Sequence, residues 1–290
     1  MGGRPACGRC QGLEQHPRGT QASRPGESVN APNPLKAVTI GVAALLTTFI
    51  IVLLLLVVTH PSPAALLSSI ASREIQFAVY LSIVTSVAST AICVLIAVPS
   101  AYALARYDFF GKNVVNTIVD MPLALPPLVA GVGLLLFFGT TPIGKALAEA
   151  GLVFIFTPLG IVVAQVFVNF PFMLRIMRST FESISPRYEY VAKTLGCTDV
   201  QALWRVTLPM ATSGLIAGGV ITWAKGIGEF GAALMLAGAT RMKTETLPIS
   251  LFLNMSCGEL DLAISAATIL IVISIASLYV FERYGGSVRL

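Results

Sequence analysis

The chain has 290 residues, of which 55% are hydrophobic and only 11% are charged, and its mean hydropathy is +0.81. Soluble domains carry about 25% charged residues, so this composition excludes an ordinary soluble protein and indicates an integral membrane protein. The net charge of +5 is explained by where Lys and Arg lie around the predicted spans, and it is not taken as a sign of nucleic-acid binding.

Residues 1–35 are polar and rich in Gly, Pro and Arg, and we expect them to form a disordered cytoplasmic tail. This tail holds Cys7 and Cys10 in a Cys-x-x-Cys pair, with His16 as the nearest further ligand. A structural zinc site takes four ligands, so the pair is interpreted as incidental. No metal and no other cofactor is expected.

Residues 36–290 are predicted to form an all-α membrane domain with six transmembrane helices. A helix of about 20 apolar residues crosses the roughly 30 Å hydrocarbon layer. Helices are the expected structure because backbone groups in lipid must be satisfied within the segment. The predicted spans are approximately 37–58, 75–104, 114–138, 155–177, 210–239 and 259–281.

Prolines and one asparagine interrupt the third and fourth predicted spans. Pro122, Pro126 and Pro127 remove backbone donors and should kink or unwind the third span. Broken helices in membranes often line a polar cavity, so Pro126 and Pro127 are candidate pathway or gate residues. Asn169 is a further candidate, because it places neutral polar atoms within the fourth span. A structural kink and hydrogen bonds between helices explain the same residues at least as well.

The stretch 190–209, YVAKTLGCTDVQALWRVTLP, is a polar interlude between apolar spans. Ser185 and Pro186 predict the start of a helix just before it, and Gly196 predicts the end of that helix, because glycine adopts a positive φ at little cost. The apolar residues of this helix recur on one face. They are Tyr188, Val191, Ala192 and Leu195.

A second short helix is predicted after the glycine, because Thr198 and Gln201 match a capping box. Pro209 then turns the chain back toward the membrane. Two such helices could lie in the lipid headgroup layer, or they could enter a groove on a soluble partner. The apolar stripe of the second helix consists of Val200, Leu203, Trp204 and Leu208.

The fifth predicted span contains two ionisable residues, Lys225 and Glu229, four residues apart and so on one helix face. A charge at mid-bilayer costs about 2.5–3.5 kcal/mol on insertion scales, which indicates a buried role. An ion pair, with each other or across a dimer, is one interpretation, and gating or the anion pathway is the other. The same span carries Gly214-xxx-Gly218, a spacing typical of close helix packing.

The orientation of the spans follows from the Lys and Arg residues in the connecting segments. Fourteen of the nineteen fall on the side of the N-terminus, four fall on the opposite side and Lys225 falls within a span. Because cytoplasmic loops carry the excess of positive charge, both termini and the segment 180–209 are expected in the cytoplasm.

The segment 190–209 resembles the cytoplasmic loop signature of permease subunits of ABC importers. That signature reads Glu-Ala-Ala, three residues, Gly, nine residues, Ile, one residue, Leu-Pro. Here nine residues separate Gly196 from Val206, and Leu208-Pro209 follows after one more. Tyr190, Val191 and Ala192 occupy the Glu-Ala-Ala positions, and Glu189 stands one residue early.

The resemblance extends over residues 40–284 and is strongest to the molybdate and tungstate permeases, followed by the sulfate and thiosulfate permeases. The segments that carry it include MPLALPPLVAGVGLLL (121–136) and WAKGIGEFGAALMLAG (223–238). The resemblance implies the type I importer fold, with 180–209 as a coupling loop to the ATPase. The coupling residues would be Tyr190, Val191, Ala192, Gly196, Trp204, Leu208 and Pro209.

The resemblance also implies a set of partners and a mechanism. Two cytoplasmic ATP-binding subunits, an extracytoplasmic substrate-binding protein and a second copy of this chain would form the complex in the lipid bilayer of the cell membrane. Oxyanion import would proceed by alternating access. Neutral polar atoms such as those of Asn169 suit a tetrahedral oxyanion that must pass without being held tightly. The chain contains no GxxxxGK[ST] phosphate loop, so ATP hydrolysis is expected on the partner and the chain is not expected to be an enzyme.

Two alternatives belong to other classes. An ion-coupled secondary transporter would account for Lys225 and Glu229, but the spacing of the cytoplasmic loop argues against it. A membrane enzyme is disfavoured because the sequence contains no HExxH, and neither His16 nor His60 has an evident catalytic partner.

Overall fold

The structure, a computed structural model, describes residues 34–285. Cys7, Cys10 and His16, and nearly all of the predicted tail, therefore lie outside the described residues. The chain divides into two units, one up to Ile50 and one from Ile51 onward, and each is described by itself. Every regular element among residues 34–285 is a helix, which confirms the predicted all-α class.

Helix α1 (Pro34–Thr59) corresponds to the first predicted span. It is long and apolar enough to cross a membrane.

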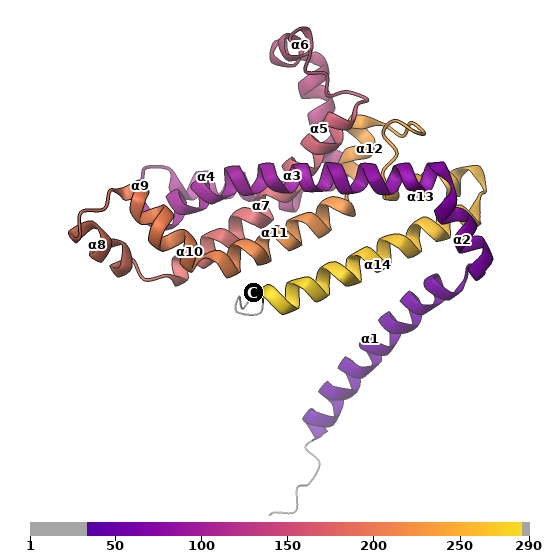
Figure 1. Cartoon of the computed structure of the whole chain (residues 1–290), viewed down its shortest axis with the longest axis horizontal. Coiled ribbons are helices and arrows are strands. Elements are labelled where there is room, and N and C mark those ends of the chain that lie inside the picture. The colour runs from indigo at the N-terminus through magenta and orange to yellow at the C-terminus, as the bar shows by residue number, and fades with distance from the viewer. Residues whose placement is uncertain (1–33, 286–290) are drawn as a thin grey trace, which may run out of the picture. The chain divides into compact units, whose positions relative to one another are not determined.

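The second unit contains the remaining helices (Figure 1). In the order of the chain, these are α2 (Pro63–Ala71), α3 (Arg73–Arg106), α4 (Lys112–Ala124), α5 (Pro127–Thr140), α6 (Pro142–Glu149), α7 (Pro158–Ser183), α8 (Arg187–Thr194), α9 (Asp199–Ala202), a π-helical turn (Leu203–Thr207), α10 (Leu208–Met210), α11 (Thr212–Ile227), α12 (Gly231–Ala237), α13 (Leu247–Cys257) and α14 (Leu260–Gly285).

Helices α3, α7 and α11 pack against one another and form the centre of this unit (Figure 1). Small residues on α3 allow α7 to approach closely, and larger side chains from α7 fill the space between them. The core cluster nearest the expected cytoplasmic end includes Cys93, Ala97, Ala101, Met173, Met177 and Phe181. This packing places the ends of α3 and α7 beside the segment 180–209.

Four described helices are long and apolar enough to be single spans: α1, α3, α7 and α14. Two bent helix pairs raise the number to six if each pair is one span: α4 with α5, and the segment Asp199–Met210 with α11. The third predicted span is one of these pairs, because α4 and α5 meet at an angle of 112°. The predicted break near Pro126 is confirmed, whereas Pro122 remains inside α4 and does not interrupt it.

The fifth predicted span, 210–239, is wrong as a continuous helix. Helix α11 ends at Ile227, and α12 begins only at Gly231. Glycine is a poor helix former, and the repeated glycines around 226–231 make a break inexpensive. The short helices α2, α6 and α13 were not predicted, since a search for segments of about 20 residues does not detect them.

The predicted contact of Gly214 and Gly218 is confirmed as a packing contact between α11 and α7. A Cβ at Gly214 would overlap the Oγ1 of Thr180 and lie 2.8 Å from its Cβ. A Cβ at Gly218 would lie 2.8 Å from the Sδ of Met173. Both distances are shorter than the contacts that real Cβ atoms make. At Gly214 the obstacle includes the Cβ of Thr180, so only glycine fits there, whereas at Gly218 the flexible Met173 side chain would have to move.

This packing predicts opposite effects for two alanine substitutions on one helix. Gly214→Ala should destabilise the protein by about 1–3 kcal/mol through overpacking. Gly219→Ala should be neutral or stabilise by up to about 1 kcal/mol, because no atom lies within 4 Å of its added Cβ and alanine favours the helix. Thermal unfolding of the two purified variants distinguishes these outcomes, and equal midpoints would contradict the packing.

Candidate functional site

The segment 185–211 has the predicted helix, glycine turn, helix organisation. Gly196 has φ = +91°, in the left-handed region, and directly follows the C-cap of α8. Gly196 N donates to Lys193 O at 3.0 Å, and Cys197 N donates to Ala192 O at 3.1 Å. These two bonds are a Schellman motif, which satisfies the last carbonyls of α8 and reverses the chain.

The capping box of the second helix is also confirmed. Gln201 N donates to Thr198 Oγ1 at 3.3 Å, and Thr198 N donates to Gln201 Oε1 at 3.0 Å. The start of the first helix differs by one residue, since Pro186 is the N-cap and Ser185 Oγ accepts from Arg187 N at 3.4 Å.

The turn back toward the bundle lies two residues later than predicted. Pro209 is inside α10, and the chain bends by 72° at Ala211, between the segment 199–210 and α11. A π-helical turn over Leu203–Thr207 precedes the bend. Such turns occur often at functional sites and shift the register of the side chains that follow.

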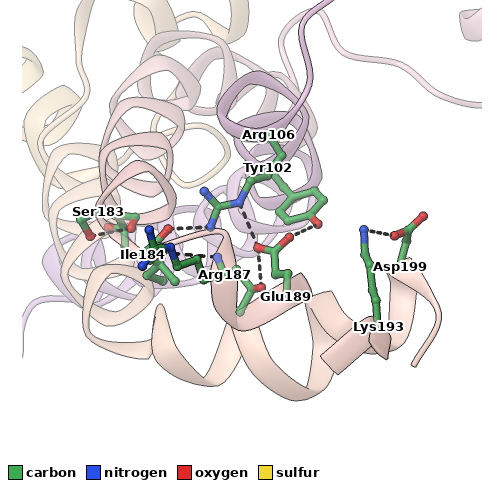
Figure 2. Close-up of polar contacts among 11 residues, drawn as sticks. Tyr102, Arg106, Ser183, Ile184, Arg187, Glu189, Lys193 and Asp199 are labelled. Carbon is green, nitrogen blue, oxygen red and sulfur yellow. Dashed lines mark hydrogen bonds and ion pairs between the residues drawn. The ribbon is translucent and has the colours of Figure 1, made fainter. Parts of the chain in front are cut away.

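A buried carboxylate attaches α8 to the rest of the second unit (Figure 2). Glu189 is 4% exposed, and its Oε2 accepts a hydrogen bond of 2.9 Å from the hydroxyl of Tyr102. Its Oε1 accepts from Arg106 Nε at 2.9 Å and from Thr207 Oγ1 at 2.8 Å. One side chain therefore joins the end of α3, the helix α8 and the π-helical turn.

The ion pair between Arg106 and Glu189 is well shielded, with side-chain exposures of 8% and 6%. Arg106 Nη2 also donates to Ile184 O at 2.9 Å, which secures the end of α7 (Figure 2). A buried ion pair is favourable only when its other polar atoms are satisfied. Here both carboxylate oxygens of Glu189, and Nε and Nη2 of Arg106, have hydrogen-bond partners. We call Tyr102, Arg106, Glu189 and Thr207 the anchor.

The anchor was only partly visible in the sequence. Glu189 stood out as a carboxylate one residue before the position where the resemblance places glutamate. Arg106 was counted only as a cytoplasmic charge, although a Tyr and an Arg four residues apart at the end of a span could have suggested a partner for it. Nothing in the sequence indicated Thr207.

The outer surface of α8 and α9 carries apolar and aromatic side chains that do not pack on their own chain. Tyr190 is 63% exposed, and Trp204 is 64% exposed. Ala192 is buried, and Leu208 is partly buried against the core, so these two residues face inward. We call the exposed set the docking stripe. It consists of Tyr188, Tyr190, Val191, Leu195, Val200 and Trp204.

A solvent-exposed ion pair connects the two helices across the glycine turn. The ammonium of Lys193 contacts the carboxylate of Asp199 (Figure 2). The hydrogen bond to Asp199 raises the pKa of Lys193, so the lysine stays charged at neutral pH. Lys193 Nζ also lies 6.0 Å from the centre of the Tyr190 ring.

The turn makes Gly196 the most sensitive position of this segment to a β-branched side chain. Gly196→Val should cost about 1–2 kcal/mol or more in the left-handed conformation, although no atom lies within 4 Å of the added Cβ. We expect the spans to stay inserted while the docking stripe is misplaced. Gly196→Asn is the control, because asparagine tolerates this φ.

Co-purification of the ATPase subunits with each variant measures this effect. The valine variant should lose them, and the asparagine variant should keep most of them. Retention of the subunits and of uptake in Gly196→Val would contradict a docking role for the segment.

The prediction that Lys225 and Glu229 share one helix face is wrong. Helix α11 ends between them, so they do not share a helix face. Lys225 Nζ lies 4.1 Å from the centre of the Phe172 ring, and no ion pair involving Lys225 occurs within residues 34–285. Glu229 is buried, and its Oε1 accepts a hydrogen bond of 3.0 Å from Ala232 N in the first turn of α12.

The other pathway candidates have different environments. Pro126 and Pro127 are exposed at the break between α4 and α5. Asn169 is 1% exposed between α3, α7 and α11, and neither of its side-chain polar atoms has a hydrogen-bond partner. In this conformation Asn169 therefore lies inside the helix bundle and does not line an open path. Residues 34–285 contain no cluster of three or more His, Cys, Asp and Glu that could hold a metal ion.

Comparison with known proteins gives a match over residues 94–284 to the family of binding-protein-dependent transport system inner membrane components. The molybdenum transport system permease protein ModB of Mycobacterium tuberculosis is 37% identical over 200 residues, which cover 69% of this chain and 75% of that protein. The sulfate transport system permease protein CysW of Synechocystis is 32% identical over 224 residues, which cover 77% of this chain and 81% of that protein.

A solved structure has the same fold. The crystal structure of a bacterial ABC transporter involved in the import of the acidic polysaccharide alginate superposes with a TM-score of 0.67. The superposition covers 88% of this chain and 98% of that chain, at 17% sequence identity. Identity at this level supports the fold alone.

Proposed function

Because this chain belongs to the family of binding-protein-dependent transport system inner membrane components, we propose that it is the permease subunit of an ATP-driven importer whose substrate is an oxyanion, molybdate in the first place. It is a multi-pass membrane protein and a transport subunit. Its task is to provide the path through the membrane, while separate subunits hydrolyse ATP and an extracytoplasmic protein delivers the substrate.

The observation that best supports this function is the docking stripe on its anchor. Exposed aromatic and aliphatic residues on two short helices are suited to a groove on a soluble partner. The anchor links this surface rigidly to α3 and α7. A movement of the docked partner would therefore be transmitted through the anchor to α3 and α7. Alternating access driven by ATP requires such a mechanical connection.

The full set of partners is part of the proposal. Two cytoplasmic ATP-binding subunits would dock on the stripes of two copies of this chain, with the binding protein on the opposite side of the membrane. Both termini would then lie in the cytoplasm, in agreement with the distribution of Lys and Arg. The coupling residues would be Tyr190, Val191, Ala192, Gly196, Trp204, Leu208 and Pro209.

Molybdate or tungstate is the favoured substrate, since a molybdenum permease is 37% identical to this chain. Sulfate is the second candidate, because the sulfate permease CysW is 32% identical over a longer segment. These anions share a tetrahedral shape and a double negative charge. Selectivity among them would come largely from the binding protein.

The test is uptake into liposomes that contain the permease, its ATP-binding subunits and its binding protein. Uptake of molybdate should require ATP and should be faster than uptake of sulfate at equal concentration. Preference for sulfate would favour the second candidate. Uptake by the permease alone, without ATP-binding subunits, would indicate an ion-coupled transporter and would overturn the proposal.

A further inference from the structure

Lys225 lies at the middle of the membrane-spanning part of the second unit. A Cβ on its neighbour Gly226 would be 3.4 Å from both Ser86 Cβ and Ser89 Oγ. These serines occupy the middle of α3, which has 34 residues and is itself apolar enough to span the membrane. Lys225 therefore lies beside the middle of a helix that can span the membrane, where a charged side chain is costly.

Within residues 34–285, Lys225 forms no ion pair. The side chain is exposed, and the ammonium lies 4.1 Å from the centre of the Phe172 ring. A cation above an aromatic ring gains about 0.5–2 kcal/mol, which does not offset the insertion cost of about 2.5–3.5 kcal/mol. Glu229, the nearest acid in sequence, attracts Lys225 electrostatically but forms no ion pair with it, and its Oε1 accepts from Ala232 N at the start of α12.

Space for a ligand exists beside this lysine. A groove with a volume of about 460 Å³ runs between α11 and α14, and Lys225 is the only charged residue that lines it. Ser274 and Ser277 also line the groove, but their hydroxyls donate to carbonyls of their own helix. The ammonium is therefore the group that would attract a ligand.

Helix α7 carries a second cation, Arg175, close to the Phe172 ring that Lys225 contacts. Arg175 is three residues after Phe172, so the two side chains are neighbours on the helix surface. Arg175 Nε and Nη2 donate to the two carboxylate oxygens of Asp120 at 3.0 and 2.9 Å, and the arginine side chain is 61% exposed. Since α7 runs toward the expected cytoplasmic side, Arg175 lies inward of Lys225.

We propose that Lys225, supported on the Phe172 ring, is a transient binding site for the transported oxyanion, and that Arg175 is the next positive charge on its way to the cytoplasm. This inference rests on the proposed function and names the residues of the path. One ammonium attracts a dianion without holding it tightly. Asp120, by occupying Arg175, keeps that guanidinium from trapping the anion.

Substitution of Lys225 in the complete transporter tests the site. Lys225→Gln removes the charge but keeps a polar, unbranched side chain, and it should lower the initial rate of molybdate uptake into liposomes about tenfold. Lys225→Arg keeps the charge and should retain most of the rate. The ATP-binding subunits should co-purify equally with both variants, because Lys225 is remote from the docking stripe.

A third variant separates anion binding from packing. Lys225→Met is apolar and suits a lipid-facing or packing role, so it should be at least as stable as the wild type and yet lose uptake about tenfold. Normal uptake in the Gln or Met variant would overturn the inference and leave the proposed function intact. Equal losses in the Arg and Gln variants would also overturn it. A wild-type complex that transports no oxyanion would instead refute the proposed function.

Discussion

Replacing Glu189 with alanine should both destabilise the protein and abolish coupled transport. The change leaves the Arg106 guanidinium buried without a counter-charge, and it deprives the hydroxyls of Tyr102 and Thr207 of their acceptor. Breaking a buried ion pair in this way costs about 3–5 kcal/mol in the free energy of unfolding. We also expect ATP hydrolysis in the assembled complex to lose its stimulation by the substrate-loaded binding protein.

Thermal unfolding of the purified permease and ATPase activity of the complex measure the two effects. Glu182→Ala is the matched control, since Glu182 forms an exposed pair with Arg178 at the end of α7. Exposed pairs of this kind contribute at most about 1 kcal/mol. Similar losses in the two variants would contradict the anchor.

A double substitution shows whether the charge itself is needed. Glu189→Met combined with Arg106→Met leaves no unpaired charge in the interior, so it should be more stable than either single variant. Coupling should nevertheless stay low, because the hydrogen bonds to Tyr102 and Thr207 are also lost. Full coupling in the double variant would mean that packing alone positions α8.

Local signals in the sequence were sufficient to predict the helix, glycine turn, helix segment. The capping box of Thr198 and Gln201 and the positive φ of Gly196 depend on residues within a few positions of each other, and both are present. The same holds for the long helices α3, α7 and α14, whose apolar stretches exceed the thickness of the membrane.

Contacts between distant parts of the chain could not be predicted in the same way. Arg106 and Glu189 are separated by more than 80 positions, and only the packing of α3 on α7 brings them together. The break after Ile227 was missed because hydropathy stays high across it. That break also separates Lys225 from the helix face of Glu229, and the Lys225 ammonium lies over the Phe172 ring.

The exposure of the docking stripe bears on the two functions first considered for 190–209. Interfacial helices present one apolar face to lipid, and the stripe alone would fit that role as well. The anchor favours partner docking, because a helix that only rests on lipid does not need a buried ion pair to fix it to two spans. This reasoning makes the stripe, and Trp204 above all, the place to test binding.

Trp204→Ala should weaken binding of the ATP-binding subunit by about 2 kcal/mol or more, which corresponds to about 30-fold in the dissociation constant. The indole is 64% exposed, so its removal should hardly change the stability of the permease itself. Phe110→Ala is the control, because Phe110 is a fully exposed aromatic residue in the short connection between α3 and α4, on the same expected side of the membrane. Titration of the subunit onto permease in lipid nanodiscs should show the loss for Trp204 and none for Phe110. The opposite outcome would contradict the docking role. In that case the Trp204→Ala permease would bind the subunit normally, while a peptide of residues 186–211 with the same substitution would no longer bind lipid vesicles. The segment would then be an interfacial helix pair.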